Sequence, residues 1–298
     1  FGAFKTSSLY MGGELVDGAY KNFVVTNKVA DQFFVGFDNF KSVMFGSQYS
    51  PQFWQAFRNT FVISFYGLLF GFPFPIILAL FFNEIRSNVY RSIIQVMTYL
   101  PKFISTVIIT TLVILLVQGK PVNSENPGVI IQLFNTLGLI KNPEVLEKGF
   151  LGGGSQFFRA IYTITGIWEG AGYGSIVYFA AIIAVAPTSY EAAQIDGAGK
   201  MEQMKYVVLP AILSTIVIML IVRIGSLLSV GYEQVILLKD WGGNTSLNET
   251  GQVVSTLALS WKNLDIQTVP EFLNNVTSMI LVIGANTISK KASGTSLY

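Results

Sequence analysis

The chain has 298 residues, of which 51% are hydrophobic and only 12% are charged, and its formal net charge is +2. Soluble domains usually carry about 25% charged residues, so this composition and a mean hydropathy of +0.53 predict an integral protein of the lipid bilayer, with no indication of a nucleic-acid partner. The chain has no cysteine or histidine, which excludes disulfides and removes the commonest metal ligand and general base. We therefore expect no catalytic residue, no metal site and no cofactor bound by this chain itself.

Residues 1–57 are mixed and polar and contain no long apolar run. We interpret them as an extracellular lead-in that follows a first span upstream of Phe1, because this arrangement makes the topology derived below consistent. The alternative is an ordinary extramembrane loop.

Five apolar runs follow, each near the ~20 residues that a helix needs to cross the hydrocarbon core. The first contains Pro73 and Pro75, which membrane helices tolerate when their neighbours satisfy the freed backbone groups. The second is interrupted at Pro101-Lys102, and a short helix is expected near Val129–Leu137 in the polar stretch that comes next. The predicted fold class is all-α, a polytopic transmembrane helical bundle within residues 58–290. Its spans lie at about 59–82, 92–118, 158–186, 206–230 and 272–289.

Positive charges near the ends of the spans predict which side faces the cytoplasm. If the five spans alternate in direction, three places rich in these charges lie on one side, and they carry Arg86 and Arg91, Lys200 and Lys205, and Lys290 and Lys291. We therefore place residues 83–91, the loop 187–205 and the tail 291–298 in the cytoplasm, with residues 1–57 outside. A chain that begins in the cytoplasm then needs a sixth span upstream.

A polar island, residues 191–210, separates the third and fourth spans. Pro187 ends the span before it, and Thr188 with Glu191 matches a capping box, which predicts the start of a new helix. Gly197 is expected to end that helix in the left-handed conformation. A further helical segment, residues 200–208, leads to Leu209-Pro210. On spacing alone, a solvated loop between spans explains this pattern.

The order of residues in this island also resembles the EAA loop of bacterial ABC importer permeases. The matching residues are Glu191, Ala192, Ala193, Asp196, Gly197, Ala198, Leu209 and Pro210. The resemblance extends over most of the chain, including Gly294-Thr295-Ser296-Leu297, and is strongest to the carbohydrate branch of the type I importers, which is maltose-permease-like and includes permeases for oligosaccharides. It implies a type I permease bundle with about six core spans, in which the loop is a coupling helix that sits in a cleft of an ATPase subunit.

The resemblance further implies transport by alternating access in the bacterial plasma membrane. An extracellular solute-binding protein would deliver the carbohydrate, two cytoplasmic ATPase subunits would bind ATP and magnesium, and a second, similar permease subunit would complete the pore. This chain carries no Gly-x-x-x-x-Gly-Lys-Ser/Thr phosphate loop, which agrees with hydrolysis in partner subunits. The resemblance therefore implies a non-catalytic membrane subunit.

Three groups of residues are candidates for the substrate pathway. Arg223 lies inside the fourth span, where a charge is costly and suggests a function, although snorkelling or a structural ion pair is the alternative. In the third span, aromatic rings and a carboxylate suit the apolar faces and hydroxyls of sugars, although an interfacial aromatic belt would use the same rings. Those residues are Trp168, Glu169 and Tyr173, and the pair Tyr232 and Glu233 beyond the fourth span has the same chemistry.

Two functions from other classes stay open at this point. A secondary transporter driven by an ion gradient would favour acidic residues within the spans, and apart from Glu169 the spans offer few. A membrane-embedded enzyme such as a glycosyltransferase would need paired catalytic carboxylates at the mouth of a span, and no such pair is evident.

Overall fold

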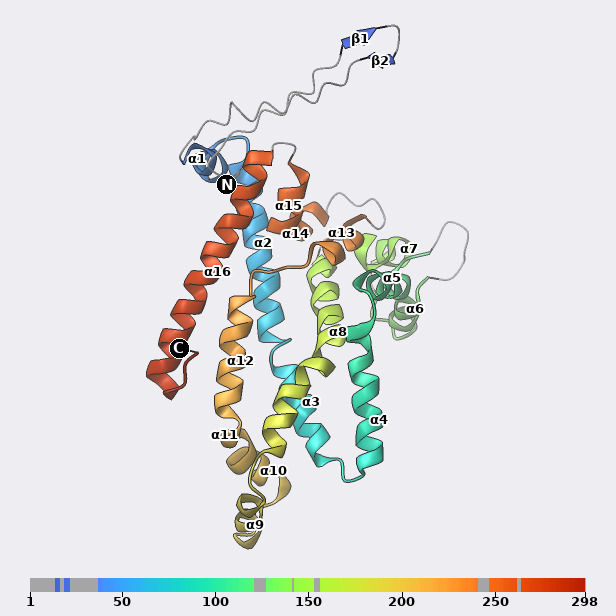
Figure 1. Ribbon diagram of the computed structural model, residues 1–298. Helices are drawn as coiled ribbons and strands as arrows, with labels where there is room; N and C mark the ends of the chain where they lie inside the picture. Colours follow the sequence, from blue (N-terminus) through green and yellow to red (C-terminus); the bar gives the residue numbers. More distant parts are fainter. Residues whose placement is uncertain are drawn as a thin grey trace.

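A computed structural model describes residues 14–16, 19–21, 37–120, 127–140, 142–152, 156–240, 247–261 and 264–297. Nearly all of this part is helical, which confirms the predicted all-α class (Figure 1). The strands β1 (Glu14–Val16) and β2 (Ala19–Lys21) form a small antiparallel hairpin, in which Glu14 lies opposite Lys21. Most of the expected lead-in before Phe37 lies outside the described residues.

The bundle is built from long helices joined by short helices and turns. Its first half contains α1 (Asp38–Phe45), α2 (Ser50–Leu69), α3 (Pro73–Glu84), α4 (Asn88–Tyr99), the 3₁₀ turn η3 (Leu100–Phe103), α5 (Thr106–Val117), α6 (Val129–Thr136) and α7 (Pro143–Gly152). The second half contains α8 (Gln156–Ile183), α9 (Pro187–Ile195), α10 (Lys200–Gln203), the π turn η4 (Met204–Val208), α11 (Leu209–Ala211), α12 (Leu213–Gly225), α13 (Tyr232–Asp240), α14 (Leu247–Gly251), α15 (Val254–Ser260) and α16 (Leu264–Ser293).

Within the part of the chain that the structure describes, two helical stretches are long and apolar enough to cross a membrane, Ser50–Glu84 and Ile266–Lys291. Three further pairs of helices meet the same criterion together but are bent, so up to five spans are present if each bent pair counts as one. That upper count equals the five apolar runs seen in the sequence. The short helix expected near Val129 is α6.

The run predicted as one span over residues 92–118 is sharply bent. The arm ending at Phe103 and the arm starting at Thr106 meet at 101°. The interruption expected at Pro101-Lys102 is therefore present, but the two arms do not form a straight span. Ile104 adopts an extended conformation (φ −86°, ψ 142°), which stops the helical hydrogen bonds between η3 and α5.

The run predicted as a span over residues 206–230 also differs from the structure. It contains the π turn η4 and a 61° bend between α11 and α12, and α12 ends at Gly225. Pro210 has no backbone N–H to offer the carbonyl one turn before it, so a regular α-helix cannot continue through this point.

Two helices extend well beyond their apolar runs. α2 begins at Ser50 and α16 at Leu264, whereas the predicted spans begin at residues 59 and 272. The boundary placed at residues 57/58 therefore falls inside α2. The extra turns are stable because their apolar side chains share a buried cluster with α1 and α15. Its members are Phe40, Val43, Phe53, Ala56, Val254, Leu257, Trp261, Ile266 and Val269.

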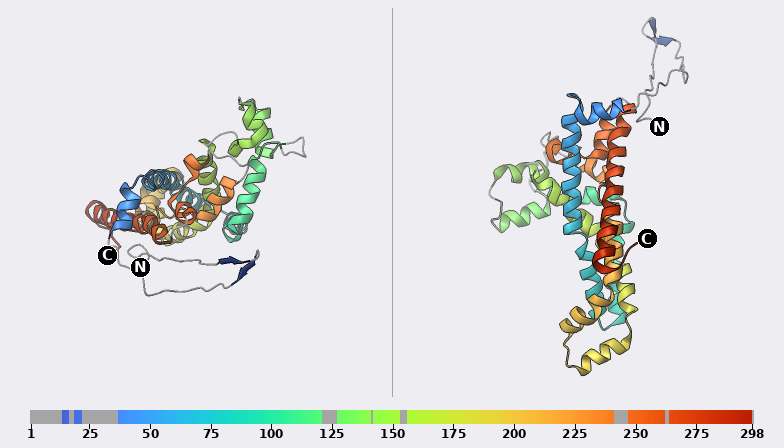
Figure 2. Two further views of the ribbon diagram at one scale, coloured as in Figure 1. Left: turned by 90° about the horizontal axis from the view of Figure 1, so that it is seen from above. Right: turned by 90° about the vertical axis from the view of Figure 1, so that its left-hand side faces the viewer.

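The elements divide between two ends of the bundle. The loop with α9 and α10 forms one end, together with the turn between α3 and α4, and the C-terminal end of α16 points the same way (Figure 1). α1, α13 and α15 lie toward the opposite end, and α6 and α7 project from one side of the bundle (Figure 2). The three places rich in lysine and arginine thus point in one direction.

α8 runs through the centre of the molecule and packs closely on its neighbours. Near the loop end, Ala79 of α3, Tyr178 and Ile182 of α8, and Ile212 share one buried cluster. Farther along α8, a Cβ at Gly172 would overlap the carbonyl oxygen of Thr98, so this glycine permits the close approach of α4.

Candidate functional site

A cavity of about 560 Å³ lies along the middle of α8. Its wall takes residues from α2, α3, α5, α8, α12 and α13, and from η3 at the bend between α4 and α5. Six of the wall residues are glycines, which leave room where side chains would otherwise fill the space: Gly67 on α2, Gly71 just beyond its end, Gly166, Gly170 and Gly174 on α8, and Gly231 before α13. The three on α8 are four residues apart, so they share one face of the helix.

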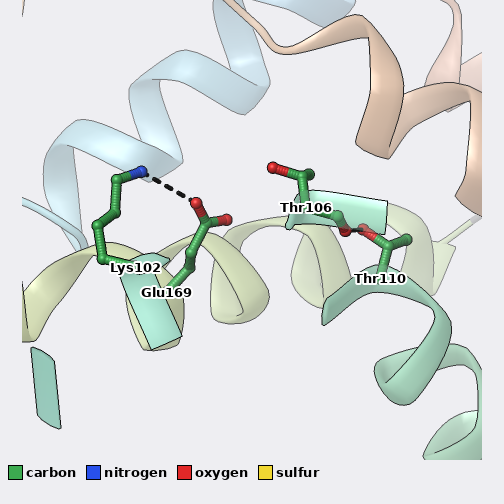
Figure 3. A network of polar contacts seen from close by, with 4 residues as sticks. All are labelled: Lys102, Thr106, Thr110 and Glu169. Carbon is green, nitrogen blue, oxygen red and sulfur yellow. Dashed lines mark hydrogen bonds and ion pairs between the residues drawn. The ribbon is translucent and has the colours of Figure 1, made fainter. Parts of the chain in front are cut away.

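An ion pair crosses the cavity wall. The Nζ atom of Lys102 lies 2.9 Å from Oε1 of Glu169, and Figure 3 shows the two side chains meeting between η3 and α8. The Glu169 side chain is only 15% exposed, so its charge needs this partner. Because Lys102 stands at the bend between α4 and α5, the pair fastens that bend to α8.

Thr106 lines the cavity beside this pair, at the start of α5. Its carbonyl oxygen accepts a hydrogen bond of 2.7 Å from the Thr110 hydroxyl one turn later, and Figure 3 shows both threonines. The Thr106 side chain thus adds a hydroxyl to the part of the wall that holds Lys102 and Glu169.

Arg223 enters the cavity from α12. A Cβ added at Gly67 would lie 3.7 Å from one of its guanidinium nitrogens, so the side chain reaches across to α2 where that helix has no side chain of its own. Among the residues that the structure describes, Arg223 has no ion-pair partner.

The segment from Ser229 to Gln234 closes the cavity at the start of α13. The Tyr162 hydroxyl accepts a hydrogen bond of 3.2 Å from the Gly231 backbone N–H, which fixes this segment on α8. The hydroxyl of Tyr232 lies 3.5 Å from Oε1 of Glu233, which is longer than a good O–H···O bond. Glu233 lines the cavity with an exposed side chain, and no other contact holds it among the residues that the structure describes.

Two polar atoms of the cavity residues stand out by their lack of a partner. Within the described residues, neither the Thr163 hydroxyl nor the Gln234 amide nitrogen has a hydrogen-bond partner. Both side chains line the cavity and are at least nine-tenths buried. Native proteins leave few buried polar groups without a hydrogen-bond partner, so each of these two needs an explanation.

The structure brings together four of the six residues predicted for a substrate pathway. Glu169, Arg223, Tyr232 and Glu233 line the cavity. Trp168 and Tyr173 do not line it, and each is 49% exposed on α8. The ring of Tyr173 instead packs edge-on against Phe103, with 6.1 Å between the centroids.

Sequence reasoning missed several cavity residues. Lys102 was noticed only as part of an interruption, although a lysine inside an apolar run is itself a signal of function. Tyr162 and Thr163 gave no signal, because a tyrosine or threonine within an apolar helix is ordinary.

The polar island forms a compact helical loop. α9 carries Glu191, Ala192 and Ala193, the turn after it holds Asp196, Gly197 and Ala198, and α11 contains Leu209 and Pro210. Gly197 has φ +81°, as predicted, and the Ala198 N–H donates to the Ala193 carbonyl at 2.8 Å. This bond across the left-handed glycine belongs to a Schellman motif, which ends α9.

The predicted capping box at Thr188 and Glu191 is wrong. α9 begins at Pro187 with Ala186 as its N-cap, and no side chain makes a capping bond. Proline already supplies the φ angle of a first helical residue and has no N–H to be satisfied, so the helix starts before Thr188.

The loop is held to the bundle mainly at the end of α3. Nζ of Lys200 forms an ion pair with Oε2 of Glu84. Tyr190 packs against the apolar cluster between α3 and α8, and this burial raises the pKa of its hydroxyl. The tip of the loop exposes apolar side chains, with Ile195 87% and Met201 74% accessible. A loop that contacted only water would gain nothing from exposing two large apolar side chains.

Comparison with known proteins adds a family. Residues 71–252 match the family described as binding-protein-dependent transport system inner membrane component. Two curated relatives come from Bacillus subtilis (strain 168). Protein LplB is 34% identical over 264 residues, covering 89% of this chain and 78% of the relative. The polygalacturonan/rhamnogalacturonan transport system permease protein YteP is 35% identical over 254 residues, covering 83% and 73%.

Solved structures with the same fold also exist. The crystal structure of a bacterial ABC transporter involved in the import of the acidic polysaccharide alginate contains a chain that is 36% identical to this one. The two chains superpose with a TM-score of 0.76, covering 88% of this chain and 86% of the other. In a second structure, of the alginate transporter in complex with an alginate pentasaccharide-bound periplasmic protein, the matching chain gives a TM-score of 0.75 at the same identity.

Proposed function

The chain belongs to the family of binding-protein-dependent transport system inner membrane components, and from that premise we propose that it is a permease subunit that moves an oligosaccharide into the cell. This membership bears out the resemblance to ABC importer permeases that the island at residues 191–210 suggested. Relatives named for polygalacturonan, rhamnogalacturonan and alginate transport support a carbohydrate as the substrate. Nothing among them supports a secondary transporter driven by an ion gradient.

The exposed loop carries the proposal. It stands apart at one end of the bundle, its two short helices are held by local hydrogen bonds, and it presents Ile195 and Met201 to its surroundings. A separate protein that covers these side chains would bury apolar surface and gain stability from it. In the proposed assembly that protein is a cytoplasmic ATPase subunit, and Glu191, Asp196 and Gly197 shape the docking element.

The ion pair at the end of α3 connects the loop mechanically to the cavity wall. A movement of the loop would pull on Glu84 through Lys200, and the start of α3 places Pro75 and the preceding Phe72 in the cavity wall. α3 also shares its apolar cluster with α8 and with the helix that leads into α12. Closure of two ATPase subunits on ATP would therefore reshape the wall and expose the cavity to alternate sides. Hydrolysis would reset it, and this chain would do no covalent chemistry.

The proposed assembly has further parts. An extracellular solute-binding protein delivers the sugar at the end that bears α1 and α13, and a second, similar permease subunit completes the pore.

The loop with α9, the turn after Glu84 and the C-terminus face the cytoplasm. Labelling tests this orientation, and the lack of native cysteine makes it clean. Ser189→Cys should react with an impermeant thiol reagent only from the cytoplasmic side, and Ser47→Cys only from outside. Reaction of Ser189→Cys from outside would reverse the topology.

The function itself is tested in reconstituted vesicles. The chain is co-expressed with the second permease subunit and the ATPase subunits of the proposed assembly. The complex is then purified and reconstituted with the loaded binding protein. We expect ATP hydrolysis that the loaded binding protein stimulates, together with uptake of the sugar. A chain that accumulates sugar without an ATPase subunit would contradict the proposal.

A further inference from the structure

The two cations in the cavity wall are used in different ways. Lys102 is paired with Glu169 at 2.9 Å, so these two charges cancel within the wall. Arg223 lines the same cavity, yet among the described residues no carboxylate forms an ion pair with it. Arg223 stands in the last turn of the apolar helix α12, and an arginine on a membrane helix is costly unless it finds a counter-charge or water.

Glu233 is the one other charged residue among the described residues that line the cavity, and within that part of the chain its only polar contact is the long one with Tyr232. The wall therefore presents a guanidinium that can only donate hydrogen bonds and a carboxylate that can only accept them. A neutral sugar offers hydroxyls to both groups but leaves the charge of Arg223 uncompensated. A sugar acid offers hydroxyls to Glu233 and a carboxylate to Arg223.

We propose that this cavity selects an acidic oligosaccharide, and that Arg223 binds the carboxylate of one of its uronic acid residues. The planar guanidinium matches a carboxylate with two parallel hydrogen bonds, which are stronger than bonds to a neutral hydroxyl. Gly67 keeps the space beside the guanidinium open. The inference deepens the proposed function and rests on it, because it names the class of sugar that the permease moves.

The test measures binding to the permease complex directly, without the solute-binding protein, so that the selectivity of that protein does not enter. The probes are trigalacturonate and the neutral galactotriose, titrated calorimetrically into the purified permease–ATPase complex. The wild type should bind trigalacturonate at least about tenfold more tightly. Arg223→Gln should remove that preference by weakening only the binding of trigalacturonate, and Arg223→Lys should keep part of it. Arg58→Gln is the matched control, since Arg58 lies on α2 and does not line the cavity.

Three results would overturn the inference. The first is equal or tighter binding of galactotriose by the wild type. The second is an Arg223→Gln variant that loses affinity for both sugars equally, and the third is a wild type that binds neither sugar. A companion measurement separates this failure from failure of the proposed function. If the reconstituted wild type takes up a neutral oligosaccharide with stimulated ATP hydrolysis, the proposed importer function is supported and only the proposed specificity for acidic sugars is rejected.

Discussion

The loop at residues 187–210 and the cavity along α8 are built in opposite ways. The loop is local, since hydrogen bonds between near neighbours shape it, and its main polar link to the bundle is the pair of Lys200 with Glu84. The cavity is non-local, and it encloses polar groups that come from distant parts of the chain. The loop turns apolar side chains outward, whereas the cavity turns charged ones inward.

Because the loop and the cavity are built independently, we expect that a mutation in one region leaves the function of the other intact. A change in the loop should disconnect ATP hydrolysis from transport while the cavity keeps its affinity for sugar. A change in the cavity wall should weaken sugar binding while the ATPase subunits still assemble. Three variants test this separation.

The largest effect is expected at Gly197. With φ +81° and nothing within 4 Å of an added Cβ, the cost of a side chain is conformational rather than steric. Valine there would strain the turn by about 1 kcal/mol or more and redirect the chain between α9 and α10. We expect Gly197→Val to insert normally but to lose nearly all stimulated ATP hydrolysis and uptake. Co-purification of the ATPase subunit and the hydrolysis rate measure this.

Gly199 supplies the control for that variant. It lies two residues farther along with φ −69°, and an added Cβ would meet only the Glu202 carboxylate at an ordinary 3.7 Å. Gly199→Ala should therefore retain most of the activity. Full activity in Gly197→Val would mean that residues 191–210 are only a connection between spans.

A smaller effect is expected from the ion pair between the loop and α3. The side chains of Lys200 and Glu84 are 61% and 33% exposed, so the pair contributes at most ~1 kcal/mol to stability. Its proposed role is to transmit movement. Lys200→Glu should lower coupled uptake severalfold with little change in sugar affinity, and the double variant Lys200→Glu/Glu84→Lys should recover much of the loss. A double variant as poor as the single one would show that the pair transmits nothing.

The same contrast explains how much could be predicted. The eight residues matched to the EAA loop lie within twenty consecutive positions, so the resemblance to that loop could be seen in the sequence, and the glycine at its helix end followed from the left-handed turn it must make. The start of α9 was missed because Pro187 acts as its first residue and makes the capping box unnecessary.

The cavity could be predicted only in part, because its composition depends on how helices rotate against one another. α8 is apolar around much of its circumference, so periodicity does not fix its inward face. Trp168 and Glu169 are adjacent in sequence and were both expected in the pathway, yet only Glu169 lines the cavity. Its partner Lys102 lies 67 positions away, beyond a bend whose angle the sequence does not reveal.

The smallest effect is expected at Thr163, and it separates a sugar-binding role from a structural one. Most helical threonines here donate to a carbonyl one turn earlier, as Thr165 does to Ile161 at 2.7 Å, but the Thr163 hydroxyl has no partner among the described residues. Valine at residue 163 removes a buried, unpaired polar group, so thermal stability should stay unchanged or rise slightly. If the hydroxyl turns toward the sugar when the wall moves, the KM for uptake should rise about two- to fivefold, the loss of roughly one hydrogen bond. Thr165→Val, which breaks an existing bond outside the cavity, should lower stability slightly and leave KM unchanged. A Thr163→Val variant with lower stability and unaltered KM would assign this hydroxyl to the fold.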